Sequence, residues 1–164
     1  MAAIQTILCP VDFSKATERQ LAMATDLARL FGARLVLHHN VSTALAGAGV
    51  GWMYAAEHHG VESESDAHEA LAKLVASVPE GIPAEGRITK GGHAMSVVVT
   101  AEVEGAQLVV VVTHGQSTED HASVTESVLD RSRCLVLALH ESSIDAAAPR
   151  FASSAAGPQV VLVP

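Results

Sequence analysis

Short apolar runs alternate with longer segments of helical spacing along the first part of the chain. Runs rich in Val, Ile and Leu are typical of strands buried on both faces of a sheet. Four such runs occupy residues 4–9, 35–39, 108–112 and 134–139, and residues 84–89 are predicted to form a weaker strand, polar enough to lie at an edge of the sheet. Helical spacing predicts four helices, which lie within 14–31, 57–78, 95–103 and 123–133. This alternation predicts an α/β fold with a mostly parallel sheet and helices on both faces.

Three segments fall outside this pattern. Residues 42–56 are rich in Gly and Ala and have no period, so we expect a loop over one edge of any site. Residues 141–157 have the Ala, Ser, Gly and Pro content of a linker, and 159–163 have the composition of one more strand. We therefore expect one domain over 1–140 and a C-terminal extension over 141–164.

Composition narrows the class of protein. Of 164 residues, 49% are hydrophobic and 17% charged, and the net charge is −8. An acidic surface argues against binding to nucleic acid or to an anionic membrane. No apolar run reaches the roughly 18 residues of a membrane span, and no signal peptide is visible, so we expect a cytoplasmic protein. Cys9 and Cys134 lie in apolar runs and are expected to stay unpaired.

The strand at 108–112 leads into Thr113-His114-Gly115, and a helix is predicted to begin near Ser123. An α/β protein holds a phosphate at such a strand–turn–helix unit, because backbone N–H groups and the helix N-terminus favour an anion. The segment that follows Gly115 is short and acidic, and it contains no further glycine. The strand, turn and helix therefore predict the backbone arrangement of a nucleotide-binding site. The acidic segment after Gly115 argues against nucleotide binding there.

Five stretches of the chain resemble the universal stress protein family. They are residues 7–14, 31–39, 108–115, 123–126 and 133–137, in the family's order and with roughly its spacing. The resemblance implies a three-layer α/β fold with five strands in the order 3-2-1-4-5. Ligands of such sheets bind at the carboxyl ends of the strands where the order reverses, here between the first and fourth strands.

The resemblance also implies a set of nucleotide-binding positions. Asp12 matches the acidic residue at the nucleoside end, and Asn40 stands where an apolar residue usually flanks the adenine. The implied cofactor-binding residues are Pro10, Val11, Asp12, Asn40, Thr113, His114, Gly115, Ser123, Val124 and Thr125.

The chain departs from the family's phosphate loop at several positions. Val112 replaces its first glycine, and six residues, rather than nine, separate Gly115 from Ala122, which stands in place of its third glycine. Glu119 and Asp120 then lie near the expected phosphate, and each carboxylate opposes it by about 1–4 kcal/mol. We therefore expect ATP or AMP to bind weakly or not at all.

Several of these residues also fit purely structural roles. Asp12 could instead close the loop after the first strand as an Asx turn, and His114 could bond a backbone carbonyl. Ser123 could act only as a helix cap, with Glu126 in the reciprocal capping position. Ser14 is the expected cap of the first helix.

Metal binding and catalysis have little support in the sequence. The chain has nine histidines, and pairs such as Glu64 and His68 share helical spacing. They lack a closed ligand pattern, so we interpret them as surface residues and predict no metal site. Ser117, His114 and Asp120 could be drawn as a triad, but neighbouring loop positions do not suit that geometry. We predict no catalytic residue.

The predicted function follows from the resemblance and from the last strand. A hydrophobic edge strand at 134–139 would promote aggregation if it were left exposed. Members of the family pair such edges across a two-fold axis, so the resemblance implies a homodimer. Residues 159–163 could add to that edge, in their own subunit or by exchange. We expect a stress-response protein that acts through dimerisation and an unknown protein partner. The alternatives are an ATP- or AMP-binding switch and a slow nucleotide hydrolase.

Overall fold

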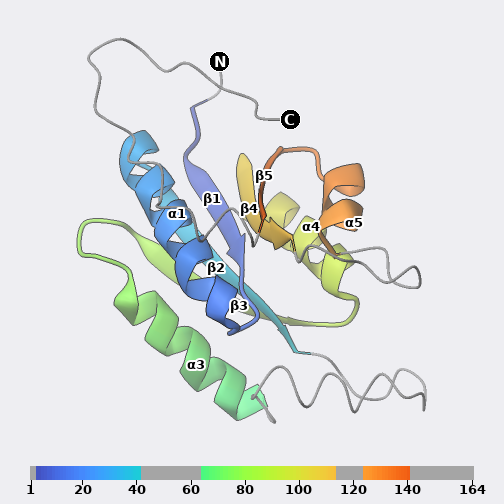
Figure 1. Cartoon of the computed structure of the whole chain (residues 1–164), viewed down its shortest axis with the longest axis horizontal. Helices are drawn as coiled ribbons and strands as arrows, with labels where there is room; N and C mark the ends of the chain where they lie inside the picture. The colour runs from blue at the N-terminus through green and yellow to red at the C-terminus, as the bar shows by residue number, and fades with distance from the viewer. Residues whose placement is uncertain (1–2, 42–63, 114–123, 141–164) are drawn as a thin grey trace.

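The protein is an α/β domain built on a five-stranded parallel sheet (Figure 1). The computed structural model describes residues 3–41, 64–113 and 124–140. The strands are β1 (Thr6–Pro10), β2 (Arg34–Val41), β3 (Ala84–Lys90), β4 (Leu108–Thr113) and β5 (Leu135–His140). The helices are α1 (Lys15–Phe31), α3 (Glu64–Ser77), α4 (His93–Val103) and α5 (Val124–Arg131). The strand order is β3-β2-β1-β4-β5, so the predicted fold and order are confirmed.

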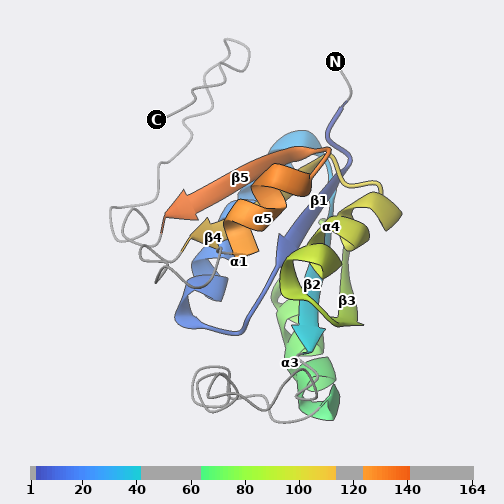
Figure 2. The ribbon, with the colours of Figure 1, turned by 90° about the vertical axis from the view of Figure 1, so that its right-hand side faces the viewer.

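Helices cover both faces of the sheet, as Figures 1 and 2 show. Successive strand residues point to opposite faces, so the Val- and Leu-rich strands feed two separate apolar clusters. On one face Ile7, Cys9 and Leu35 pack with residues of α1 and α3. On the other, Leu8 and Val36 pack with residues of α4 and α5. This double burial explains why the strands appear in the sequence as continuous apolar runs.

The two edge strands differ in character. In β3 the apolar residues Ala84 and Ile88 are only partly buried, and the polar residues between them make it the edge that the sequence predicts. Gly86 allows close packing there, because a Cβ at this position would lie 3.0 Å from the Leu71 side chain, which would have to shift by a few tenths of an ångström. The opposite edge, β5, is much more apolar. Within the described ranges, no helix is long and apolar enough to cross a membrane.

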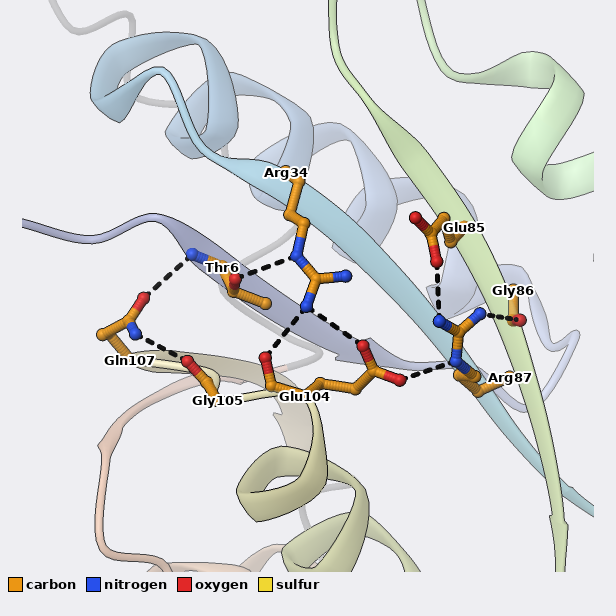
Figure 3. A network of polar contacts seen from close by, with 8 residues as sticks. All are labelled: Thr6, Arg34, Glu85, Gly86, Arg87, Glu104, Gly105 and Gln107. Atoms are coloured by element: carbon orange, nitrogen blue, oxygen red, sulfur yellow. Dashed lines mark hydrogen bonds and ion pairs between the residues drawn. The ribbon is translucent and has the colours of Figure 1, made fainter.

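A charged network joins β2, β3 and α4 (Figure 3). Glu104, which caps the C-terminus of α4, accepts hydrogen bonds from Arg34 Nη2 at 3.0 Å and Arg87 Nε at 2.6 Å. Arg34 Nη2 also donates to the Glu104 carbonyl, and Arg87 Nη2 donates to Glu85. Burial disfavours the Glu104 charge, but the bonds from Arg87 and Arg34 outweigh it and hold the pKa of this carboxyl below its ordinary value. The two arginines also offset the unfavourable charge at a helix C-terminus.

We expect Glu104→Gln to lower the free energy of unfolding by about 1–2 kcal/mol near neutral pH, because two charge-assisted bonds are weakened. The folded pKa is lowered, so this contribution is complete above the ordinary carboxyl pKa of 4.5 and is lost as the pH falls through the folded value. Urea unfolding of both proteins across this range measures the difference.

Glu102→Gln is the matched control. The Glu102 side chain is half exposed, and its Oε1 lies 3.8 Å from Arg133 Nε, so it forms only a weak surface ion pair. We expect this substitution to change the free energy of unfolding by less than about 0.5 kcal/mol. Equal losses for the two variants would contradict a special role for Glu104.

Candidate functional site

The candidate site lies where the strand order reverses, at the carboxyl ends of β1 and β4. These strands pair only at Ile7 with Leu108 and at Leu8 with Val109, although each continues beyond that point. They therefore lose their mutual ladder just before the ends at which open α/β sheets bind ligands. We call the residues 10–12, Asn40, Thr113 and 124–125 the switch-point site.

Gln20 connects the two strands after their ladder stops. This side chain of α1 is 5% exposed, and its Nε2 donates to the Pro10 carbonyl at 2.6 Å and to the Val110 carbonyl at 2.7 Å. One amide group thus donates to a carbonyl of each strand beyond the point where the ladder between β1 and β4 stops. Gln20 is not among the residues that the sequence pattern predicts for the site. The available signal was a polar residue within the buried stripe of α1, beside Thr17, Leu21 and Ala24.

Asp12 stabilises the turn between β1 and α1. Its Oδ1 accepts hydrogen bonds from the Ser14 backbone N–H at 3.0 Å and from the Thr17 hydroxyl at 2.9 Å. The first of these is the Asx turn weighed as an alternative. Ser14 is the N-cap residue, but its side chain makes no capping bond, so the predicted capping role of its hydroxyl is wrong. The Asp12 carboxylate instead ties the loop to the first turn of α1 through the Ser14 N–H and the Thr17 hydroxyl.

Phe13 fixes the same loop against β2. Its φ of 61° is in the left-handed region, which costs a residue other than glycine about 1–2 kcal/mol. Its ring lies 4.3 Å from the ring of His39, whose Nδ1 is 2.8 Å from the Val11 carbonyl oxygen. The aromatic contact and its partial burial in the apolar cluster offset the backbone cost. Nothing in the sequence pattern indicates this φ value.

Asn40 is directed into the protein rather than presented to a ligand. It is 7% exposed, its Nδ2 donates to the Gly91 carbonyl at 2.9 Å, and its Oδ1 accepts from the Thr89 hydroxyl at 3.0 Å. Thr89 in turn lies 2.8 Å from His38 Nε2. Because the Thr89 proton goes to Asn40, its oxygen accepts from a neutral His38 that is protonated at Nε2.

The protonation state of His38 supports that assignment. Burial, followed by repulsion from His39 and His93, lowers the pKa of His38 from 6.5 to about 4. The ring is therefore neutral at physiological pH, and a single tautomer fits the hydrogen bonds around it. This chain of polar groups anchors the end of β2 to β3.

On the β4 side, Thr125 is 5% exposed and donates to the Val112 carbonyl at 3.1 Å, which ties α5 to the end of β4. The Thr113 hydroxyl is directed to the Leu139 carbonyl at 3.5 Å, and Val124 is 43% exposed. The predicted site residues His114, Gly115 and Ser123 lie outside the described residues, as do the predicted loop at 42–56 and the residues 159–163.

The switch-point site therefore combines the predicted residues of the first, second and fourth strands at one end of the sheet. The described polar side chains there, on Asp12, Asn40, Thr113 and Thr125, each bond to protein atoms. Within residues 3–41, 64–113 and 124–140, no three His, Cys, Asp or Glu side chains gather as metal ligands. Cys9 is buried and its pKa is raised to about 12, so it is not a nucleophile at neutral pH.

Gln20→Leu tests the bridge between β1 and β4. We expect it to lower the free energy of unfolding by about 2–4 kcal/mol, because the Pro10 and Val110 carbonyls lose their donor. Gln20→Glu should also destabilise the protein near neutral pH, since a carboxylate then faces two carbonyl oxygens, and should recover part of the loss when protonated. Urea unfolding at neutral and acidic pH measures both. A change below about 0.5 kcal/mol for Gln20→Leu would contradict the bridge.

A sequence model of the universal stress protein family matches residues 3–140. A solved universal stress protein in complex with cAMP is 25% identical, with a TM-score of 0.61 over 85% of this chain and 98% of that one. UspA from Lactobacillus plantarum is 21% identical, with a TM-score of 0.66 over 85% and 99%. An Archaeoglobus fulgidus universal stress protein in complex with dAMP is 19% identical, with a TM-score of 0.59 over 84% and 98%. No curated protein sequence matches the chain significantly.

Proposed function

The chain belongs to the universal stress protein family, and we propose that it acts in stress signalling or protection as a homodimer that binds a protein partner. In this proposal ATP and AMP bind weakly or not at all. The observation that carries it is a contrast within the described residues, between an apolar β5 that pairs with β4 alone and a switch-point site whose polar groups bond to the protein itself.

The β5 edge has the properties of an association surface. In the part of the chain that the structure describes, β5 pairs with β4 alone, and Leu135 is 64% exposed. Leu129 of α5, the helix that packs beside β5, is 49% exposed. An apolar edge strand has backbone groups on its outer side that can pair further, and a two-fold axis at β5 would let the edges of two copies pair with each other.

The weak-nucleotide part of the proposal rests on hydrogen-bonding capacity. A bound adenine or ribose needs donors and acceptors that are available to it, whereas both ends of the Asn40 amide, Asp12 Oδ1 and the Thr125 hydroxyl proton are already engaged within the protein. Rearranging them would cost bonds before any are gained.

A nucleotide-binding switch is the second candidate function. The solved relatives in complex with cAMP and dAMP favour it, since their fold and the position of the switch point are shared. The Asp12 carboxylate and the Thr113 hydroxyl would then change partners on binding.

Isothermal titration calorimetry with ATP and with AMP tests the weak-nucleotide proposal. We expect no saturable heat, or a dissociation constant above about 100 µM at physiological salt. Micromolar binding that Asp12→Ala abolishes would favour the switch instead. Asp26→Ala is the matched control, because Asp26 is an exposed acid of the neighbouring helix whose carboxylate pairs with Arg29.

Light scattering tests the dimer. We expect the mass of two chains at micromolar concentration and a shift to one chain in Leu135→Lys, because a charge at the strand edge opposes pairing. Leu30→Lys is the control, since Leu30 is also 64% exposed but lies on α1. A monomeric wild-type protein would contradict the proposal, and dissociation by both variants would show that β5 is not the interface.

A further inference from the structure

We infer that residues 159–163 of one copy pair with β5 of the second copy, so that the dimer is closed by exchange of C-terminal strands. The inference rests on the proposed homodimer and names the contact that forms it. The surface involved is the outer edge of β5, and the segment that pairs with it is residues 159–163 of the other copy.

The β5 edge is suited to an apolar strand. Leu137 and Leu139 are partly buried against the apolar cluster on the α1 face, whereas Leu135 on the same side of the strand is 64% exposed. On the opposite face, Val136 packs against the cluster beneath α4 and α5. A neighbouring strand with apolar residues on both faces would extend both clusters by one strand and cover Leu135.

Residues 159–163 have that composition. The segment Gln159-Val-Val-Leu-Val163 is rich in β-branched residues, carries no charge and is nearly as long as the six-residue β5. Pro158 and Pro164 flank it, and proline is tolerated at strand ends and on edge strands. As the outermost strand, this segment would hinder further pairing through its prolines.

The length of the linker favours the second copy over the segment's own. Eighteen residues separate His140 from Gln159, whereas a hairpin back along β5 needs about two to five. Structureless loops longer than about 15 residues are uncommon within compact domains. A random coil of eighteen residues spans roughly 25 Å, which exceeds one strand length of about 20 Å and would be sufficient to reach an adjacent copy.

Val161→Pro in the full-length chain tests the exchange, because proline removes a ladder donor from the centre of the segment. We expect sedimentation equilibrium to give a dimer dissociation constant weakened by roughly a hundredfold. Val161→Thr keeps a β-branched residue and its N–H, so it should retain the wild-type constant.

The outcomes separate this inference from the proposed function. A wild-type dimer that Val161→Pro leaves unchanged would overturn the exchange and preserve the dimer through β5 itself. A monomeric wild-type protein would overturn both. A wild-type dimer that Val161→Pro dissociates and Val161→Thr does not would support both.

Discussion

The Gln20 amide between β1 and β4 is the interaction on which the rest of the structure depends. Two parallel strands that diverge leave carbonyl groups without ladder partners inside a sheet covered on both faces. Two short bonds from a single buried side chain satisfy the Pro10 and Val110 carbonyls. The turn that carries Asp12 and Phe13 starts from Pro10, so α1, its N-terminal turn and the switch-point site share this support.

Beyond that bridge, the described polar groups are engaged mainly in holding elements together. Asp12 stabilises the start of α1, Asn40 and His38 connect β2 to β3, and Thr125 connects α5 to β4. Each bond is worth about 1 kcal/mol, and a ligand that displaced it would have to offset that loss. The described polar side chains of the site are consequently engaged within the protein, whereas β5, in the part of the chain that the structure describes, pairs with β4 alone. This contrast directs the proposed function toward association rather than nucleotide chemistry.

The sequence predicted the fold because alternating apolar runs and helical spacing are local signals, and even the weak polar strand at 84–89 was identified as an edge. It predicted the location of the switch-point site through the family pattern. It did not find Gln20, whose acceptor Val110 is distant in sequence, or the bonds from Arg34 and Arg87 to Glu104. Periodicity carries no information on which distant polar groups will meet. The Asx turn at Asp12 depends on where the Ser14 and Thr17 donors lie relative to its carboxylate, and no sequence pattern specifies that.

Acid denaturation of freshly purified protein, followed by chromatography of the released small molecules, tests most directly whether the switch-point site is internally satisfied. A nucleotide that is bound in the cell commonly stays bound through purification when it dissociates slowly. We predict adenine nucleotide far below one molecule per chain. Stoichiometric ATP or AMP would contradict that prediction and would make the protein a nucleotide-binding member of its family.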